Sequence, residues 1–165
     1  MDYRPLNIDD AEQFLKFNIE MGKSGYMLYA PGERKMSVEE QQQLIHKITE
    51  DPASNLLIGE EEGGITGFIM MKGNELERNR HSAYFALGVK EESRGQGIGK
   101  ELLRQAFKWA REKGVSRLEL TVRKDNKTAI HMYKQMGFKI EGEKVHSLKI
   151  GGEYLNEYYM YKLLK

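Results

Sequence analysis

The sequence contains no cysteine, and this absence excludes several kinds of site at once. Disulfide frameworks, thiolate nucleophiles and zinc sites with thiolate ligands all require cysteine. Prolines are scarce, three among 165 residues, and 39% of residues are hydrophobic against 31% that are charged, which argues against extended disorder. The formal net charge is only +1, from 26 basic and 25 acidic residues, so the chain as a whole offers no electrostatic surface for nucleic acid.

Long hydrophobic runs are missing as well. The apolar run at residues 83–87 is far shorter than the roughly 20 residues that a membrane-spanning helix needs. Residues 1–5 lack the basic and then apolar layout of a signal peptide, and the absence of cysteine fits a reducing compartment. We therefore expect a soluble, cytoplasmic protein without a membrane partner. A chain of this length corresponds to about one domain, residues 1–165. It is long enough to bury a hydrophobic core without disulfide bonds or a structural metal.

The hydrophobic pattern predicts the order β-α-α-β-β-β-α-β-α-β-β. The expected strands lie at 2–6, 55–61, 65–72, 80–89, 117–122, 138–149 and 153–162, and the expected helices at 9–20, 37–51, 98–113 and 126–136. Asp9 or Asp10 suits the start of the first helix, and Ser37 with Glu40 three residues later predicts a capping box at the start of the second. The strand–helix–strand piece from 80 to 122 requires parallel pairing through a right-handed crossover, whereas the two hairpins require antiparallel pairing. We expect a mixed α/β fold, with a central sheet of about seven strands and about four helices on both of its faces.

A glycine-rich turn at residues 95–99 separates a predicted strand from the helix with the strongest apolar stripe. Glycines let a ligand approach the backbone, and the free N–H groups and dipole of a helix N-terminus favour phosphate. The spacing does not fit a dinucleotide fingerprint, because Lys100 stands at its last glycine. It does not fit a Walker loop either, because Arg94 and Glu101 replace the required glycine and hydroxyl residue. Three glycines in five residues favour binding over a merely flexible turn.

Three motifs resemble the GNAT superfamily of acetyl-CoA-dependent N-acetyltransferases. Residues 94–99 are similar to its Arg/Gln-x-x-Gly-x-Gly/Ala signature. Residues 126–138 resemble its Asn-x-x-Ala-x-x-x-Tyr-x-x-x-Gly-Phe helix and turn, and residues 138–160 resemble the closing hairpin of its ribosomal-protein and small-amine acetyltransferase branches. The resemblance covers roughly residues 80–162, whereas the first 75 residues match only in the order of their elements.

The resemblance implies one N-acetyltransferase domain with the GNAT fold, in which a parallel pair of strands splays around the cosubstrate acetyl-CoA. It implies direct transfer of an acetyl group to a primary amine of a small molecule in a ternary complex, without a metal. The residues that it implies for cosubstrate binding are Gly95, Gln96, Gly97, Ile98, Gly99 and Lys100 for the pyrophosphate, Arg94 at its rim, Leu87, Gly88 and Val89 for the pantetheine arm, and Asn126 for the arm or its neighbouring loop.

Acetyl transfer to an amine needs both a base and an acid. An alkyl amine with a pKa of about 10.4 is protonated at neutral pH, and a departing thiolate, whose thiol pKa is about 8.5, leaves more readily when it receives a proton. The resemblance assigns the acid to Tyr133, because the family's tyrosine at this point often faces the thioester sulfur. The pattern alone favours a core aromatic residue with a hydrogen-bonded hydroxyl.

Glu119 is the candidate base. It lies in a predicted strand whose Leu118 and Leu120 point to the opposite face, and a carboxylate there can have a raised pKa or can pair with a nearby cation. Some family members carry a glutamate on this strand, but counting back from Asn126 places theirs at Thr121. Water is an alternative base, as are two glutamates that end an earlier strand, Glu60 and Glu61.

The acceptor pocket is the least determined part of the site. Residues 21–36 occupy the place of the family's acceptor wall, and we take Tyr26, Tyr29 and Tyr84 as candidate substrate-binding residues. A protein N-terminus or a lysine is the alternative acceptor. A non-catalytic acyl-CoA-binding module and a nucleotide-binding protein are alternatives of another class. A homodimer is implied by the resemblance only.

Metal chemistry is not expected. The four histidines are scattered, and none of them pairs with another at the spacing of metal ligands; they are His46, His81, His131 and His146. We expect these side chains to lie on the surface.

Overall fold

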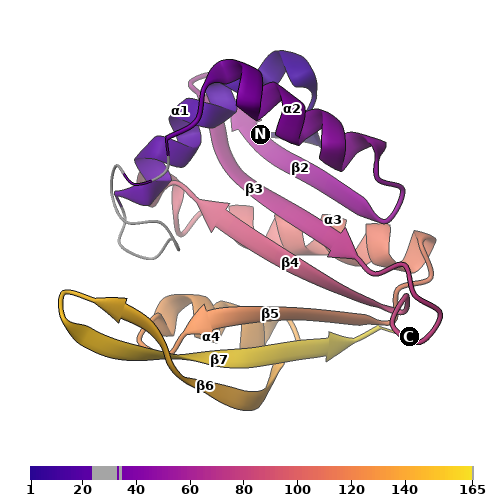
Figure 1. Cartoon of the computed structure of the whole chain (residues 1–165), viewed down its shortest axis with the longest axis vertical. Coiled ribbons are helices and arrows are strands. Elements are labelled where there is room, and N and C mark those ends of the chain that lie inside the picture. The colour runs from indigo at the N-terminus through magenta and orange to yellow at the C-terminus, as the bar shows by residue number, and fades with distance from the viewer. Residues whose placement is uncertain (24–32, 34, 165) are drawn as a thin grey trace. The chain divides into compact units, whose positions relative to one another are not determined.

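Helices and strands follow one another in the predicted order. A computed structural model describes residues 1–23, 33 and 35–164 of the chain (Figure 1). The strands are β1 (Asp2–Pro5), β2 (Ser54–Glu61), β3 (Gly64–Gly73), β4 (Ser82–Val89), β5 (Arg117–Arg123), β6 (Lys139–Ile150) and β7 (Glu153–Leu163). The α-helices are α1 (Ala11–Gly22), α2 (Val38–Glu50), α3 (Ile98–Glu112) and α4 (Lys127–Gln135), with short 3-10 turns η1 (Ile8–Asp10) and η2 (Glu91–Ser93).

The seven strands form one mixed sheet in the order β1-β2-β3-β4-β5-β7-β6, which confirms the predicted fold class. The chain divides into two compact units, and strand β4 and helix α3 each contribute to both. The first unit contains residues 1–72 and 86–106, and the second contains residues 73–85 and 107–165.

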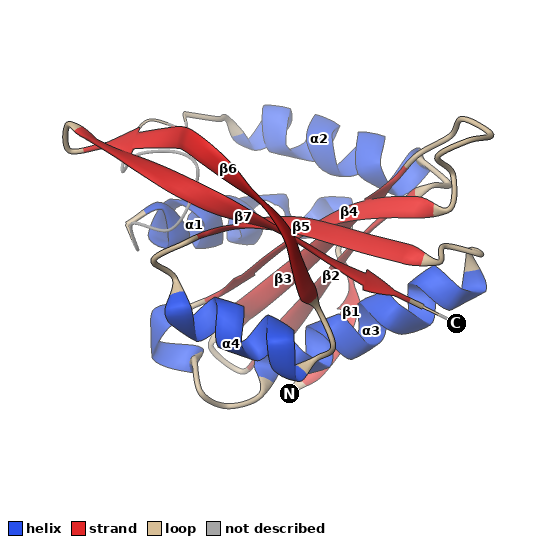
Figure 2. Ribbon diagram, turned by 90° about the horizontal axis from the view of Figure 1, so that it is seen from below, coloured by secondary structure: helices blue, strands red, loops and turns tan. Residues whose placement is uncertain are grey.

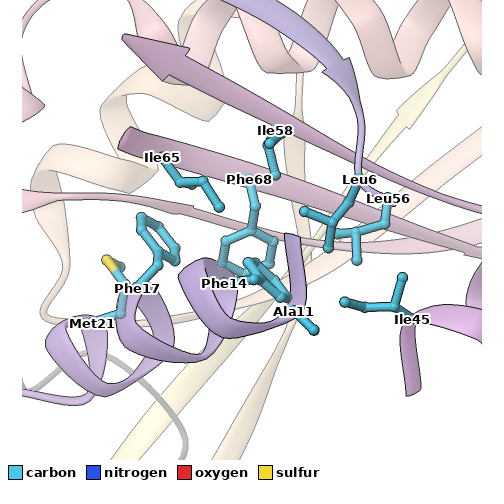
Figure 3. Close-up of a cluster of buried hydrophobic side chains, with 10 residues drawn as sticks. All are labelled: Leu6, Ala11, Phe14, Phe17, Met21, Ile45, Leu56, Ile58, Ile65 and Phe68. Atoms are coloured by element: carbon cyan, nitrogen blue, oxygen red, sulfur yellow. The ribbon is translucent and has the colours of Figure 1, made fainter. Parts of the chain in front are cut away.

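In the first unit, helices α1 and α2 lie over strands β2 and β3 (Figure 1). The rings of Phe14 and Phe17 on α1 meet Phe68 of β3 edge to face, with centroids 5.7 and 5.8 Å apart (Figure 3). The preceding residue, Gly67, faces α3 instead, since a β-carbon there would lie 3.2 Å from both Ile98 and Leu102. Because side chains alternate along a strand, α1 and the first turns of α3 cover opposite faces of β3.

Side-chain caps set the starts of the helices in this unit. Helix α1 begins at Ala11 with Asp10 at its N-cap position, so the predicted start at Asp9 or Asp10 is confirmed. The side-chain cap belongs to the preceding turn η1, where Asn7 is the cap and the Asp10 carboxylate accepts a hydrogen bond from the Asn7 N–H at 2.9 Å. The Asp10 carboxylate also receives two hydrogen bonds of 2.8 Å from Arg4. The predicted capping box of α2 is confirmed, because the N–H of Glu40 donates to the Ser37 hydroxyl at 3.1 Å.

Helix α3 carries the predicted apolar stripe, and all six members are buried: Ile98, Leu102, Leu103, Ala106, Trp109 and Ala110. The predicted end of the helix is confirmed as well. Gly114 has φ +73°, and the N–H of Val115 donates to the carbonyl of Ala110 at 2.8 Å. A left-handed glycine followed by such a backward hydrogen bond is the usual way to close a helix.

In the second unit, helix α4 lies on one side of strands β5, β6 and β7 (Figure 2). Strand β4 pairs in parallel with β5 from Ser82–Arg117 to Tyr84–Glu119, and the register does not continue to the next pair. Strand β5 pairs along its whole length with β7. The second core is aromatic, with the ring of Phe138 lying 5.5 Å from that of Phe85.

The β6–β7 hairpin is irregular. Its register shifts twice, between Ile140 and Gly142 and between Lys144 and Leu148. His146, in the second irregularity, has φ +52°, and its N–H donates to the side chain of Asn156 at 2.7 Å. None of the helices in the described residues is long and apolar enough to cross a membrane.

Candidate active site

The glycine-rich turn before α3 has the open backbone that the sequence predicts. Gly95 and Gly97 have φ values of +79° and +81°, a region that L-amino acids rarely adopt. A β-carbon added at either position would meet no atom within 4 Å. The surface of this turn is therefore free to receive a ligand, and its conformation requires glycine.

The N-terminus of α3 adds hydrogen-bond donors to this turn. The N–H of Glu101 makes a helical hydrogen bond, to the carbonyl of Gly97 at 3.0 Å. The N–H groups of Ile98, Gly99 and Lys100 come earlier in the helix, where no carbonyl one turn back is available to them. With the positive end of the helix dipole, these donors suit an anionic ligand such as a phosphate.

Arg94 places a cation beside this turn. Its side chain is exposed, and its Nε donates to the carbonyl of Val89, at the end of β4, at 3.3 Å. The same end of the strand is held by the N–H of Lys90, which donates to the carbonyl of Thr66 at 2.9 Å. The ammonium group of Lys90 pairs with Glu20 at 3.3 Å. The predicted residues 87–89 and 94–100 thus belong to one compact unit.

Tyr133, the candidate acid, is a buried side chain of the second unit. It is 5% exposed, and its ring centroid lies 5.7 Å from that of Phe138 and 6.0 Å from that of Phe85. Burial, and to a smaller extent the nearby Tyr84, raises the pKa of the Tyr133 phenol. The hydroxyl is therefore protonated at neutral pH and has a proton to donate.

Glu119, the candidate base, has a cationic partner. Its carboxylate accepts hydrogen bonds from Nε and Nη2 of Arg117 at 3.2 and 3.1 Å. The same guanidinium pairs with Glu141 and lies 5.0 Å from the ring centroid of Tyr161. Glu119 thus has the pairing that we gave as its structural interpretation, and its role as a base stays a prediction.

Tyr84 lies opposite Glu119 in the register of β4 and β5. It is 38% exposed, and its hydroxyl is 3.4 Å from that of Thr121, two residues along β5. The structure therefore brings Tyr84 close to the position at which some family members carry a glutamate. Tyr26 and Tyr29 lie outside the described residues.

Asn126 acts on its own helix. Its side-chain oxygen accepts from the N–H of Ala129 at 3.3 Å, which makes it the N-cap of α4. Its two expected roles, contact with the cosubstrate arm and fixing of the loop after β5, stay predictions. The other glutamates proposed as bases differ from each other, since Glu60 pairs with Arg4 at 2.8 Å and Glu61 is exposed.

The predicted surface position of the four histidines is confirmed, because all of them are exposed. Among the residues that the structure describes, no three histidine, aspartate or glutamate side chains come together as they would to hold a metal ion.

Sequence reasoning missed Arg117 as the partner of Glu119. The period of two along a strand, which places residues 117 and 119 on the same face, could have identified it.

Comparison with known proteins assigns the family. The sequence profile of the acetyltransferase (GNAT) family matches residues 23–138. The chain belongs to this family. The resemblance found in the three sequence motifs is thus confirmed, and this GNAT protein is an acetyl-CoA-dependent acyltransferase.

Individual relatives agree with this assignment. The L-amino acid N-acetyltransferase AaaT of Escherichia coli strain K12 is 33% identical over 119 residues, which are 69% of this chain and 71% of the relative. A ribosomal-protein-alanine N-acetyltransferase from Brucella melitensis has the same fold, with a TM-score of 0.88 at 24% identity over 99% of this chain and 100% of the other. An acetyltransferase from Salmonella typhimurium, solved with its cofactor acetyl-CoA, gives 0.87 at 17% identity over 100% and 94%.

Proposed function

We propose that this GNAT enzyme transfers the acetyl group of acetyl-CoA to a primary amine of a small, amino-acid-like acceptor, by direct attack in a ternary complex. The observation that carries the proposal is the glycine-rich turn at the start of α3, with its open backbone and free N–H groups. When bound, acetyl-CoA supplies the activated acetyl thioester. A protein of the same fold was solved with acetyl-CoA as its cofactor, which supports this choice of cosubstrate.

The turn would bind the pyrophosphate of the cosubstrate. The N–H groups of residues 95–100 would donate to its oxygens, and the Arg94 guanidinium would neutralise part of its charge. The open space over the two left-handed glycines supports this fit, because a phosphate needs close approach to the backbone. The main chain of residues 87–89 would hold the pantetheine arm and the thioester carbonyl.

Tyr133 would donate the proton that the leaving sulfur takes up. As the bond between nitrogen and the acetyl carbon forms, the carbon–sulfur bond breaks, and the phenol gives its proton to the thiolate. Burial keeps this phenol neutral beforehand, but it makes the resulting phenolate costly. The proton must therefore be replaced within the same turnover, from the acceptor amine or from water.

The acceptor ammonium must lose a proton before it attacks. Glu119 is our first candidate to receive it, directly or through water, with Arg117 keeping its carboxylate in place. Water alone, or one of the glutamates Glu60 and Glu61, is the alternative. Tyr84 and the tyrosines Tyr26 and Tyr29 are proposed to contact the acceptor.

A small acceptor is favoured because the relative that is one third identical is named for L-amino acids. The alternative acceptor is a protein N-terminus or a lysine. We keep it because a protein of the same fold is named a ribosomal-protein-alanine N-acetyltransferase. The cytoplasm and a homodimer stay predictions.

The test is a measurement of thiol release from acetyl-CoA in the presence of pooled acceptors, namely amino acids, polyamines, aminoglycosides and short peptides. Release above the acceptor-free rate in the amino-acid pool is expected. Release only with peptides would favour the alternative. If no pool releases thiol, the melting temperature is measured with and without acetyl-CoA. An increase would show that the cosubstrate binds and that the right acceptor was absent. An unchanged melting temperature would contradict the cosubstrate assignment itself.

A further inference from the structure

The helix that carries Tyr133, α4, ends in a turn that closes on the backbone of Tyr133 itself. The carbonyl of Tyr133 accepts hydrogen bonds from the N–H of Met136 at 3.1 Å and from the N–H of Phe138 at 2.9 Å. Between these two residues, Gly137 has φ +94°, the left-handed conformation with which a helix commonly ends. The last turn of α4 therefore fixes the backbone from which the Tyr133 side chain extends.

Lys162 of β7 caps this turn. Its Nζ donates to the carbonyl of Met136, the C-cap residue of α4, at 2.7 Å. A β-carbon at Gly137 would lie 2.8 Å from the same Nζ, so the ammonium group fills the space that a side chain there would need. A cation at this position also lies at the negative end of the helix dipole. The end of α4 is thus tied to a strand that is itself paired with β5, where Lys162 lies opposite Leu118.

The ammonium group also contacts an aromatic ring. It lies 4.4 Å from the ring centroid of Phe107 on α3, within the range of a cation–π interaction. Burial, and to a smaller extent the nearby Arg111, lowers the pKa of the Lys162 ammonium, so placing a cation there has an electrostatic cost. The hydrogen bond to Met136 and the ring of Phe107 offset this cost. Lys162 therefore connects α3, α4 and β7 through one group.

We propose that Lys162 is a positioning residue for Tyr133. Its ammonium group keeps the last turn of α4 closed and thereby holds the Tyr133 phenol where it can give its proton to the leaving sulfur. The inference rests on the proposed role of Tyr133 as the acid. Proton transfer requires the donor within hydrogen-bond reach of the acceptor, and a misplacement of about 1 Å can cost about 10²-fold in rate.

The first experiment measures the closure of α4 and needs no acceptor. Lys162→Met keeps the length of the side chain and removes its charge and its N–H donors. Amide hydrogen exchange, followed by NMR, should become at least about tenfold faster at Met136 and Phe138, because a charged hydrogen bond at the helix end is lost. Exchange at Ile130, near the start of α4, should stay within about threefold of the wild type. Wild-type exchange at Met136 and Phe138 in a folded Lys162→Met protein overturns the inference.

Lys134→Met is the matched control. Lys134 is an exposed lysine in the same last turn of α4, so its replacement removes the same charge near the same end of the helix. Exchange at Met136 and Phe138 should stay within about threefold of the wild type, because the dipole effect of an exposed charge is small. Equal acceleration in Lys134→Met and Lys162→Met would assign the effect to charge alone and would overturn the inference.

A double-mutant cycle then tests whether Lys162 acts through Tyr133. Lys162→Met should lower kcat for thiol release with the amino-acid pool by about 10–100-fold. The dissociation constant of acetyl-CoA should stay close to the wild-type value, because the turn proposed to bind the pyrophosphate belongs to the first unit. In the Tyr133→Phe background the same change should have no further effect on kcat, since the group that Lys162 positions is already absent. Equal losses in both backgrounds would show a general structural effect and would contradict the positioning role.

Failure of the proposed function gives a different result. A wild-type rate in Tyr133→Phe contradicts the proposed acid itself, whereas a reduced rate there with a wild-type rate in Lys162→Met overturns only the positioning role. If Lys162→Met does not fold, Lys162→Arg takes its place, because it keeps a positive charge and N–H donors. This variant is expected to keep the wild-type amide exchange and kcat. A lower kcat with unchanged exchange would overturn the inference, since the rate would then be lost without any loosening of α4.

Discussion

At the scale of single residues, burial gives the Tyr133 hydroxyl its distinct chemistry. Tyr133 is 5% exposed, whereas Tyr159 of β7 is 40% exposed. A buried phenol resists ionisation, so its proton is available at neutral pH but is released only when a strong acceptor is present. A departing thiolate is a weaker base than this phenolate, so the transfer requires that the phenol regain a proton as it gives one up. The proposed role of Tyr133 as acid therefore depends on the timing of proton replacement and not on a lowered pKa.

Tyr133→Phe is expected to lower kcat by about 10²–10⁴-fold, the usual contribution of a positioned proton donor. The dissociation constant of acetyl-CoA and the melting temperature should change little, because the ring that packs on Phe138 remains. Steady-state rates of thiol release and calorimetry measure these quantities. Tyr159→Phe is the control, with a wild-type rate expected. A wild-type rate in Tyr133→Phe would make this tyrosine a core residue only.

Gln41 on α2 is expected to reduce stability. Its side chain is fully buried, and neither atom of its amide group has a hydrogen-bond partner among the described residues. An unpaired buried polar group costs about 1–3 kcal/mol. Gln41→Leu should therefore raise the free energy of unfolding in urea by about 1 kcal/mol. The exposed Gln43→Leu should stay within about 0.5 kcal/mol. A loss of stability in Gln41→Leu would contradict this account.

Asp10 should give the protein a pH-dependent stability. Hydrogen bonds from Arg4, which outweigh the effect of burial, hold the pKa of the Asp10 carboxyl below its usual value of about 3.9. A carboxyl with a lowered folded-state pKa stabilises the fold above the unfolded-state value, and this contribution is lost as pH falls through the folded-state pKa.

The free energy of unfolding is thus expected to fall below about pH 4 in the wild-type protein. Asp10→Asn should be less stable at pH 7 and should lose less on acidification. Urea unfolding at a series of pH values measures both. Asp9→Asn, at the exposed neighbouring position, is the control and should follow the wild-type curve. Parallel curves for Asp10→Asn and the wild type would show that other carboxyls dominate.

At the scale of elements, the two ends of α3 can be compared directly. Gly97 before the helix and Gly114 after it both have positive φ, at +81° and +73°, and both face open space. Their backbone strain on substitution is therefore similar. Only the first end presents free N–H groups and the positive end of the dipole.

Gly97→Asp is expected to weaken acetyl-CoA binding by at least about tenfold, or 1.4 kcal/mol, because it adds strain and a negative charge at the turn that we propose binds the pyrophosphate. Gly114→Asp should cost similar stability without this loss of affinity. Calorimetry and melting curves of both variants give the comparison. If Gly97→Asp binds acetyl-CoA with the wild-type affinity, the proposal that this turn binds the pyrophosphate is wrong.

The elements themselves were largely predictable from the sequence. The apolar stripe of α3 and the Ser37–Glu40 capping box are local patterns, and both predictions are confirmed. The start of the first helix was predicted as well, since α1 begins at Ala11 with Asp10 at its N-cap position. The hydrogen bonds of the Asp10 carboxylate to Arg4, a residue of β1, were not predicted. Local signals cannot reveal such a partner.

The candidate site was predictable to a similar extent. The glycine-rich turn and Tyr133 could be identified from the sequence because each belongs to a motif that is defined by the spacing of its residues. The pairing of Arg117 with Glu141 depends on the register of β6 and β7, which two irregularities shift. His146 at φ +52° belongs to one of them, and no local sequence signal marks a histidine for that conformation.

At the scale of the whole molecule, the sheet ends in two strands that are poorly suited to pairing with another chain. Strand β1 has only four residues and includes Pro5. Strand β6 is interrupted twice and carries charged side chains along its length. Short, irregular and charged edges disfavour the addition of a further strand. We expect that adding salt at neutral pH will not cause strand-mediated association, which sedimentation velocity can check.

The position of β7 has a consequence for how the protein is made. This strand follows β6 in the chain, yet it lies between β5 and β6, pairing with β5 from Arg117–Leu163 to Arg123–Glu157. A ribosome therefore has to deliver residues up to 163 before the edge of β5 is satisfied. Until then the nascent chain exposes an unpaired strand while its earlier helices can already fold. The synthesis of the β6–β7 hairpin is thus the interval in which the nascent chain exposes the edge of β5.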